Sequence, residues 1–360
     1  MTIYLLGAFL LSLGCGAVFT PLILDFCKRK KLYDLPNERK VHTNAIPRMG
    51  GISFFPSMML AFVVILIYLA SKNPESIPVN IWSASYIIGL ALIYVVGIVD
   101  DLIGLNASTK FTAQIVAGCL LPLTGLYINN LYGFLGIYEI PGLIGIPLTI
   151  FAIVFISNAI NLIDGIDGLA SSLSLMAFAG FLSYFIHYEV YTNTYSLLIA
   201  GMMGALVAFI YFNVFGKPEK NTKIFMGDSG SLSLGFTLGF FAVKTAMHNQ
   251  NIWDYRPEAF LVPVTLIFIP IADVVRVTLY RMYKRQPLFK ADKNHIHHKL
   301  MKSGLNQHQA LIAILLMTVV IYAMNYLLLP TLSSTLIIAI DILFFLLVNM
   351  GINLRIKSAS

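Results

Sequence analysis

The chain has 360 residues, of which 58% are hydrophobic and only 11% are charged, and its mean hydropathy is +0.80. A soluble domain carries about 25% charged residues, so 24 basic and 17 acidic side chains are too few to cover a soluble protein of this length. The composition argues against a soluble enzyme, a disordered protein and a disulfide scaffold, and indicates a polytopic membrane protein. The net charge is +7, and the basic residues lie between apolar segments. Membrane topology and anionic phosphate ligands explain this placement better than binding to nucleic acid does.

Eleven segments are apolar enough over roughly 20 residues to form membrane-spanning helices. The expected fold class is therefore an all-α polytopic membrane protein, formed by one domain over residues 1–360. Between residues 120 and 150, Gly, Pro and aromatic residues interrupt the apolar pattern, and a hairpin on the outer face is expected at residues 128–142. The predicted spans are residues 3–26, 50–70, 82–99, 111–127, 143–163, 169–187, 195–213, 230–247, 258–280, 309–329 and 334–354.

The basic residues predict the orientation of these spans. The cluster Lys28–Lys31 follows the first apolar run instead of preceding it, which favours an uncleaved span with its N-terminus outside. All but three of the 24 lysines and arginines then fall on the cytoplasmic side, together with the C-terminus; the exceptions are Lys72, Lys244 and Arg256. The expected cytoplasmic loops are residues 27–49, 100–110, 164–168, 214–229 and 281–308.

Acidic residues at membrane depth are costly and therefore mark candidate functional sites. Three acidic motifs lie at the expected cytoplasmic ends of spans. The first is Asp100-Asp101, which closes the third span in the sequence VVGIVDDLIG. Two adjacent carboxylates repel each other unless a cation or a basic group offsets their charge. They are candidates for a metal-binding or base pair, and the alternative is a solvated helix end with Lys110 nearby.

The second motif is NAINLIDGIDGLA, residues 158–170. Asn158, Asn161 and Asp164 recur every third residue and so share one face of a helix. Asp167 follows between two glycines that loosen the backbone. Two amides and two carboxylates that emerge together from an apolar span are typical of an oxygen-ligand site for Mg²⁺. A plain helix end with a glycine cap would not need four polar groups at this depth.

The third motif is FMGDSGSLSLG, residues 225–235, a turn rich in glycine and serine that opens the eighth span. Backbone N–H groups at a helix N-terminus attract phosphate. Asp228 could there hold a metal ion that bridges to the phosphate. The alternative is that Asp228 or Ser229 is a plain N-cap.

Two basic loops lie on the same expected face. Loop 281–308 carries His295, His297 and His298, which lack the Cys or acidic partners of a zinc site and are expected to donate hydrogen bonds to phosphate or sugar. Loop 28–51 carries further basic residues among Pro, Asn and Gly, as expected for a shaped loop that binds an anionic lipid headgroup or substrate phosphates. These residues are Arg39, Lys40, His42 and Arg48.

Three other charged residues are expected to be structural. Asp273 and Arg276 lie three residues apart on the ninth span and should pair with each other. Asp341 is a lone carboxylate in the last span, and we expect packing partners to satisfy it.

Five motifs, in order from about residue 36 to about residue 300, resemble the polyprenyl-phosphate N-acetylhexosamine-1-phosphate transferases. They are PNERKVH with PRMGG (36–51), VDD (99–101), NAINLIDGIDGLA, FMGDSGSLSLG and HIHH (295–298). The resemblance implies ten to eleven helices and transfer of a sugar 1-phosphate from UDP-N-acetylglucosamine to undecaprenyl phosphate. The implied products are the lipid-pyrophosphate-sugar and UMP, and the implied cofactor is Mg²⁺ or Mn²⁺.

The same resemblance implies a role for each candidate residue. The metal ligands would be Asn161 and Asp228. The catalytic residues would be Asp100, Asp101, Asp164, Asp167 and His297, with Asp100 binding or deprotonating the lipid phosphate. The substrate-binding residues would be Arg39, Lys40, His42, Arg48, Lys110, Asn158, Ser229, His295 and His298.

The details of the motifs favour one branch of this superfamily. HIHH favours the N-acetylglucosamine branch over the muramoyl-pentapeptide branch, which stays the alternative within the superfamily. DGIDG argues against the eukaryotic dolichol enzymes, so we expect a bacterial plasma membrane protein that starts O-antigen, enterobacterial common antigen, teichoic acid or capsule synthesis. A homodimer is also implied. The alternative from another class is a proton- or cation-coupled transporter, which predicts polar groups near the membrane midplane in two matching halves.

Overall fold

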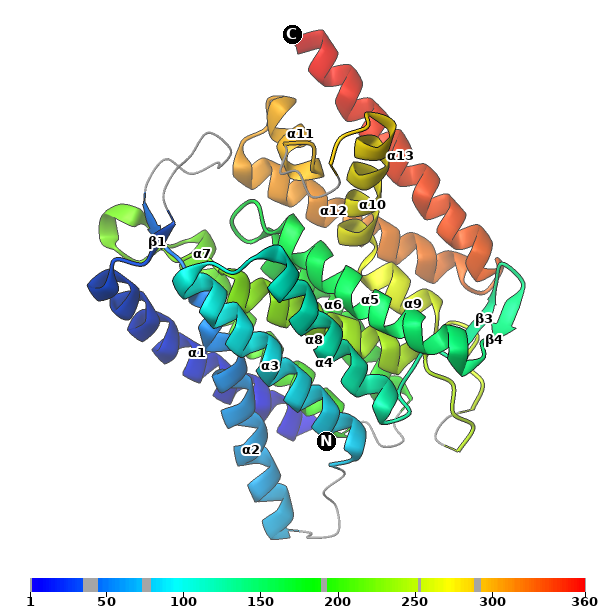
Figure 1. The fold of residues 1–360 in the computed structure, drawn as a ribbon, viewed down its shortest axis with the longest axis horizontal. Helices are drawn as coiled ribbons and strands as arrows, with labels where there is room; N and C mark the ends of the chain where they lie inside the picture. Colours follow the sequence, from blue (N-terminus) through cyan, green and yellow to red (C-terminus); the bar gives the residue numbers. More distant parts are fainter. Residues whose placement is uncertain are drawn as a thin grey trace.

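The computed structural model describes residues 2–34, 45–72, 79–188, 193–251, 254–287 and 293–359. The protein is a bundle of helices with two short antiparallel strand pairs (Figure 1). The first elements are α1 (Thr2–Lys30), β1 (Tyr33–Asp34), β2 (Ile46–Pro47), the 3₁₀ helix η1 (Gly50–Ser53), α2 (Phe54–Lys72), α3 (Ile81–Ile103), α4 (Ala107–Leu123), β3 (Asn130–Phe134), β4 (Ile137–Glu139) and α5 (Gly142–Ile163). They are followed by α6 (Leu169–His187), α7 (Asn193–Val214), the 3₁₀ helix η3 (Pro218–Lys220), α8 (Asp228–Ala246), α9 (Leu261–Leu266), α10 (Phe268–Tyr283), α11 (Ile296–Lys302), α12 (Gln307–Leu328) and α13 (Ser334–Ala359).

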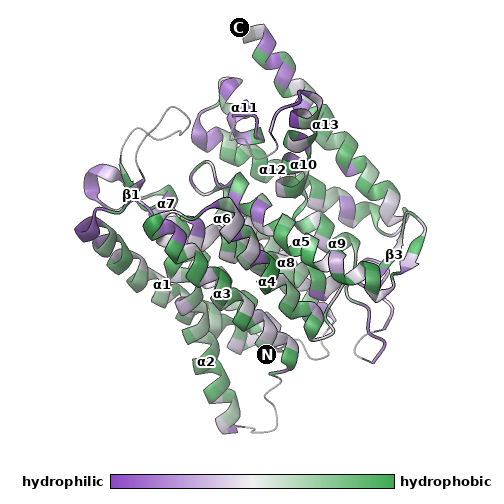
Figure 2. Cartoon of the chain, viewed as in Figure 1, coloured by the Kyte–Doolittle hydropathy of each residue, from purple (hydrophilic) through white to green (hydrophobic). Residues whose placement is uncertain are grey.

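Eight helical segments of the described chain are long and apolar enough to cross a membrane. They coincide with eight of the predicted spans and identify a multi-pass membrane protein, whose long helices are predominantly apolar in Figure 2. The predicted fourth and eighth spans are also helices, but α4 has only 17 residues and α8 is rich in glycine and serine. The eight segments are α1, η1 with α2, α3, α5, α6, α7, α12 and α13.

The predicted ninth span, residues 258–280, is wrong as one continuous helix. The structure divides it into α9 and α10 at Ile267. Pro270 has no N–H group to donate to the carbonyl of Leu266, four residues earlier. That carbonyl instead accepts a 2.6 Å hydrogen bond from the hydroxyl of Tyr322 on α12. Because lipid offers no hydrogen bonds, a neighbouring helix must satisfy the freed backbone group.

The central helix of the bundle is α8, in which every residue from 229 to 246 is buried. Glycines allow two neighbouring helices to approach it closely. A Cβ on Gly97 of α3 would lie 2.5 Å from the Cα of Ser229, and a Cβ on Gly235 of α8 would lie 2.5 Å from the Cα of Ser157 on α5. Protein rather than lipid surrounds α8, so it does not need a uniformly apolar sequence. These contacts bring the ends of α3 and α5 to the first residue of α8.

Two smaller predictions are confirmed, and a third is confirmed in part. Residues 130–139 form the expected hairpin through β3 and β4. Arg276 donates a 2.7 Å hydrogen bond to the buried carboxylate of Asp273. Asp341 on α13 is fully buried and accepts a 2.7 Å hydrogen bond from the side-chain amide of Asn325 on α12. The prediction for Asp341 therefore holds for one carboxylate oxygen, because its Oδ1 is buried without a hydrogen-bond partner among the described residues.

Candidate active site

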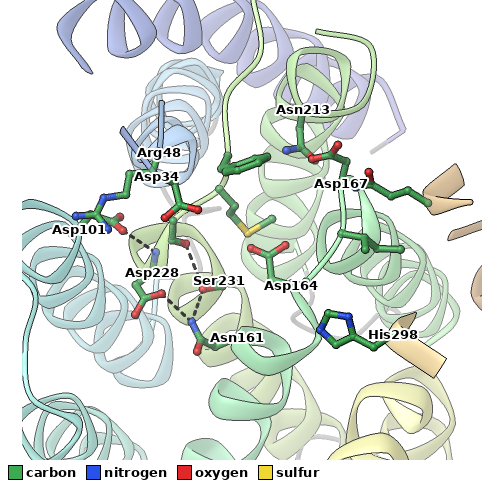
Figure 3. A pocket seen from close by; sticks show the side chains of 16 residues that line it. Asp34, Arg48, Asp101, Asn161, Asp164, Asp167, Asn213, Asp228, Ser231 and His298 are labelled. Carbon is green, nitrogen blue, oxygen red and sulfur yellow. Dashed lines mark hydrogen bonds between the residues drawn. The ribbon is translucent and has the colours of Figure 1, made fainter. Parts of the chain in front are cut away.

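A cavity of about 330 Å³ opens where the ends of α3 and α5 meet the start of α8 (Figure 3). Among the described residues, its walls combine acidic side chains from distant parts of the sequence with one arginine and one histidine. The polar lining residues are Asp34, Arg48, Asp101, Asn161, Asp164, Asp167, Asn213, Asp228, Ser231, His298 and Gln307. The cavity therefore brings the three predicted acidic motifs together.

Asp228, the first residue of α8, is the centre of a polar cluster that joins three other helices. Its Oδ1 accepts a 3.0 Å hydrogen bond from the side-chain amide of Asn161 on α5 (Figure 3). Its Oδ2 lies 2.7 Å from the Nζ of Lys110 on α4, and the same Nζ lies 3.2 Å from the carboxylate of Asp100 on α3. Lys110 thus neutralises part of the charge of two carboxylates, as expected for the basic neighbour of an acidic pair.

Asp101 caps α8 from another helix. Its Oδ1 accepts the backbone N–H of Asp228 at 2.9 Å, and its Oδ2 accepts the N–H of Ser229 at 3.0 Å. The first turn of a helix leaves these N–H groups unpaired, and a carboxylate there also interacts favourably with the helix dipole. Gly227, with φ of 76°, lies against this carboxylate, and a Cβ there would be 2.6 Å from its Oδ2. Neither Asp228 nor Ser229 caps α8 with its own side chain, so the plain N-cap alternative is wrong.

Asp164 directly follows α5, and its carboxylate points into the cavity (Figure 3). It has no hydrogen bond or ion pair with any residue in the described part of the chain. Burial and the negative charges of Asp167, Asp228 and Asp101 raise the pKa of Asp164 to about 7. A cation in the cavity would counteract this rise in the pKa, because its charge would offset the mutual repulsion of the carboxylates.

Two residues that the sequence did not point to hold the loop after α5. Asp167 lies 2.5 Å from the Nζ of Lys223 in the loop before α8. The side chain of Asn213, near the end of α7, accepts the N–H of Gly168 at 2.7 Å and donates to the carbonyl of Ile224 at 2.9 Å. Asn213 is a single polar residue in an apolar run and Lys223 ends the polar stretch KPEKNTK, and the only sequence signal for either was its place on the expected active face.

The three histidines have different environments. His298 lines the cavity. His297 is buried, and neither of its ring nitrogens has a hydrogen-bond partner among the described residues. Burial, with the charges of His298 and His295, lowers the pKa of His297 to about 3, so its imidazole is neutral. It packs on Gly165, where a Cβ would lie 2.1 Å from its Nε2. The Nδ1 of His295 lies 2.8 Å from the carboxylate of Asp273, which therefore positions the histidine motif.

Some predicted substrate-binding residues do not line the cavity. Asn158 donates a 2.6 Å hydrogen bond to the Oε1 of Gln114 and so joins α5 to α4. The hydroxyl of Ser229 is buried without a hydrogen-bond partner in the described residues. Arg48 does line the cavity, as does Asp34, which the sequence did not single out. Three predicted residues lie outside the described residues: Arg39, Lys40 and His42.

The donor set of the cavity suits a hard cation rather than a soft one. No group of three or more His, Cys, Asp or Glu is arranged around a common point in the described ranges. Asp164 and Asp228 nevertheless supply carboxylate oxygens to the same cavity, and Asn161 supplies an amide. Mg²⁺ uses one or two protein carboxylates together with water and substrate phosphates. The residues present therefore fit an ion that the substrate helps to coordinate.

Comparison with known proteins agrees with this geometry. Residues 83–246, which run from the first turn of α3 to the end of α8, match the family described as glycosyl transferase family 4. A probable undecaprenyl-phosphate N-acetylglucosaminyl 1-phosphate transferase of Bacillus subtilis (strain 168) is 28% identical, over 96% of this chain and 90% of that protein. The undecaprenyl-phosphate alpha-N-acetylglucosaminyl 1-phosphate transferase of Escherichia coli (strain K12) is 29% identical, over 83% of this chain and 78% of that protein.

A third relative is the decaprenyl-phosphate N-acetylglucosaminephosphotransferase of Mycobacterium tuberculosis (strain CDC 1551 / Oshkosh). It is 30% identical, over 80% of this chain and 73% of that protein. The similarity to all three proteins extends well beyond the acidic motifs into the flanking helices. With its membrane-spanning bundle and its acidic cavity, the chain belongs to glycosyl transferase family 4.

Proposed function

We propose that this protein transfers N-acetylglucosamine 1-phosphate from UDP-N-acetylglucosamine to undecaprenyl phosphate and releases UMP. The observation that carries the proposal is the acidic cavity at the first residue of α8, in a family member whose relatives are named for this transfer. The lipid-linked product would start a cell-surface polysaccharide, such as a teichoic acid or a lipopolysaccharide O-antigen.

In this reaction an oxygen of the lipid phosphate attacks the β-phosphorus of the nucleotide sugar. A P–O bond forms while the bond from the β-phosphorus to the oxygen bridging to the α-phosphorus breaks, and UMP leaves with that oxygen. Both reactants are anions, so the protein must neutralise charge and align phosphates rather than form a covalent intermediate. A phosphate monoester is already largely ionised at about pH 7. Positioning of the lipid phosphate can therefore suffice without a general base.

We propose Mg²⁺ as the cofactor, with Mn²⁺ as a substitute. Asn161 and Asp228 would hold the ion, and Asp164 offers a further carboxylate on the same cavity. When bound, the cation would offset the negative charge of the phosphates of the nucleotide sugar. Among the described residues, the excess of carboxylates over basic side chains in the cavity wall supports this proposal, as does the absence of a partner for the carboxylate of Asp164.

The other polar residues of the site would position the two substrates. Lys110, between Asp100 and Asp228, would place a positive charge beside the lipid phosphate. Arg48 and His298, on the cavity wall, would contact the phosphates or the sugar of the donor. The hydrogen bonds from the start of α8 to the Asp101 carboxylate would hold the cluster in place during turnover.

We further propose that the acidic cavity faces the cytoplasm of a bacterial cell, with the N-terminus outside the plasma membrane and the C-terminus inside. The basic residues support this orientation, because only Lys72, Lys244 and Arg256 fall on the opposite side. The nucleotide sugar is soluble and the acceptor is a membrane lipid, so an active site at the membrane surface would reach both.

The test compares two donors in the presence of purified protein, undecaprenyl phosphate and Mg²⁺. The proposal predicts UMP release from UDP-N-acetylglucosamine. Release of UMP only from UDP-N-acetylmuramoyl-pentapeptide would assign the protein to the muramoyl-pentapeptide branch instead. Cation flux in liposomes without release of UMP from either donor would favour a transporter.

A further inference from the structure

A second cavity, of about 710 Å³, lies between α11 and the last turns of α13. It shares no lining residue with the acidic cavity. Figure 1 shows α11 and the C-terminal part of α13 on the side of the molecule away from α1 and α2. The second cavity is therefore a separate feature of the bundle.

The described charged side chains that line this cavity are all basic. Four lysines line it, namely Lys293, Lys299, Lys302 and Lys357, and none of the other described lining residues is acidic. The Nζ of Lys299 donates a 3.1 Å hydrogen bond to the side chain of Asn349 on α13. Burial and the positive charge of Arg276 lower the pKa of Lys299 to about 8. An anion in the cavity would offset the repulsion among these cations.

The side of the cavity formed by α13 combines the apolar side chains of Met350, Leu354 and Ile356 with the polar ones of Asn353 and Lys357. Met350 and Leu354 lie one turn apart on α13 and are 56% and 59% exposed. They belong to the membrane-spanning segment that ends at Ser358, whereas the lysines of α11 lie outside the membrane-spanning segments. Lysines beside exposed apolar side chains match an anionic group carried at the membrane surface.

We propose that this cavity binds the phosphate group of an anionic ligand, separately from the substrates of the acidic cavity. Two sources carry this chemistry: the headgroup of an anionic phospholipid and a soluble phosphate. Lysines at the end of a span also orient the chain during insertion. That role requires neither a cavity nor a lysine held half-buried against α13 by Asn349, whereas an anion site requires both.

The test measures ligand binding by the full-length protein in a nonionic detergent. Phosphatidylglycerol, phosphatidylcholine or inorganic phosphate is added, and the midpoint of thermal unfolding is followed against ligand concentration to give an apparent Kd. The test variant is Lys302→Gln/Lys357→Gln, at two exposed positions of the cavity rim. The matched control is Lys217→Gln/Lys220→Gln, which removes the same charge from the exposed loop between α7 and α8.

A lipid ligand predicts that phosphatidylglycerol, but not phosphatidylcholine, stabilises the wild-type protein and the control. Its binding to the test variant should be weaker by on the order of 25-fold, about fivefold per lysine. A soluble ligand predicts the same difference with inorganic phosphate. Identical binding curves for the two double variants with every additive would overturn the proposal. Because the readout is binding, this result is independent of the transfer reaction.

Discussion

The carboxylate of Asp164 makes the metal-free fold sensitive to pH. In the folded protein its pKa is about 7, compared with an ordinary value of 3.8, so the folded protein binds this proton more tightly than the unfolded chain. Ionisation of Asp164 therefore destabilises the folded protein relative to the unfolded chain. This loss of stability is absent below about pH 4, grows as the pH rises, and is complete above about pH 7. If the carboxylate were fully buried, the loss in the free energy of unfolding would be about 4 kcal/mol, because each unit of difference between the two pKa values corresponds to about 1.4 kcal/mol. Solvent in the cavity screens the charge, so we expect about 2–4 kcal/mol.

The substitution Asp164→Asn tests this reasoning, because it keeps the shape of the side chain and removes the charge. Thermal unfolding is measured in detergent without divalent cations at about pH 5 and about pH 8. We expect the variant to be more stable than the wild type at pH 8, with a gain less than half as large at pH 5. Added Mg²⁺ should stabilise the wild type at pH 8 more than the variant, while the variant loses transferase activity.

The control is Asp25→Asn, which removes the charge of a 62% exposed carboxylate near the end of α1 and should leave the unfolding midpoint unchanged at both pH values. If Asp164→Asn instead lowers the midpoint equally at both pH values, the carboxylate stabilises the fold through a partner. The argument from repulsion would then be wrong.

Three further substitutions test the contacts around the cavity. Asp101→Asn replaces one acceptor of the α8 cap by a donor, and should cost about 1.5–3 kcal/mol in the free energy of unfolding; unchanged unfolding would exclude the capping role. Gly165→Ala places a Cβ 2.1 Å from the Nε2 of His297, and the displaced imidazole should reduce turnover. Wild-type kinetics would show that the protein absorbs this steric overlap without disturbing the site. Lys223→Gln leaves the carboxylate of Asp167 unpaired in a largely buried site and should lower the free energy of unfolding by about 3 kcal/mol. Adding Asp167→Asn should recover most of this loss, and a double variant no more stable than Lys223→Gln would contradict the pairing.

The sequence was sufficient to predict most of the long helices and the meeting of the acidic motifs. Long apolar runs leave few alternatives to a helix inside a membrane. Acidic groups at corresponding ends of several spans must then lie at the same end of the bundle. This reasoning placed Asp101, Asn161 and Asp228 together before the structure showed the hydrogen bonds among them.

The roles of individual residues depended on contacts between distant segments. Asp101 caps a helix that begins 127 positions later, and nothing local to VDD distinguishes a cap from a ligand. The prediction that Asp273 pairs with Arg276 was right, but its second contact, to His295, depends on how the loop after α10 folds back. The break in the ninth span did have a local signal, because Pro270 removes one backbone hydrogen bond.

The central claim is that this protein transfers a sugar together with its phosphate. Mass spectrometry of the lipid product tests this most directly, after incubation of purified protein with undecaprenyl phosphate, UDP-N-acetylglucosamine and Mg²⁺. We predict that the lipid gains one N-acetylhexosamine and one phosphate group, that UMP appears in equal amount, and that Asp228→Ala forms neither product. A lipid that gains the sugar alone, with release of UDP, or a lipid that remains unchanged, would contradict the account.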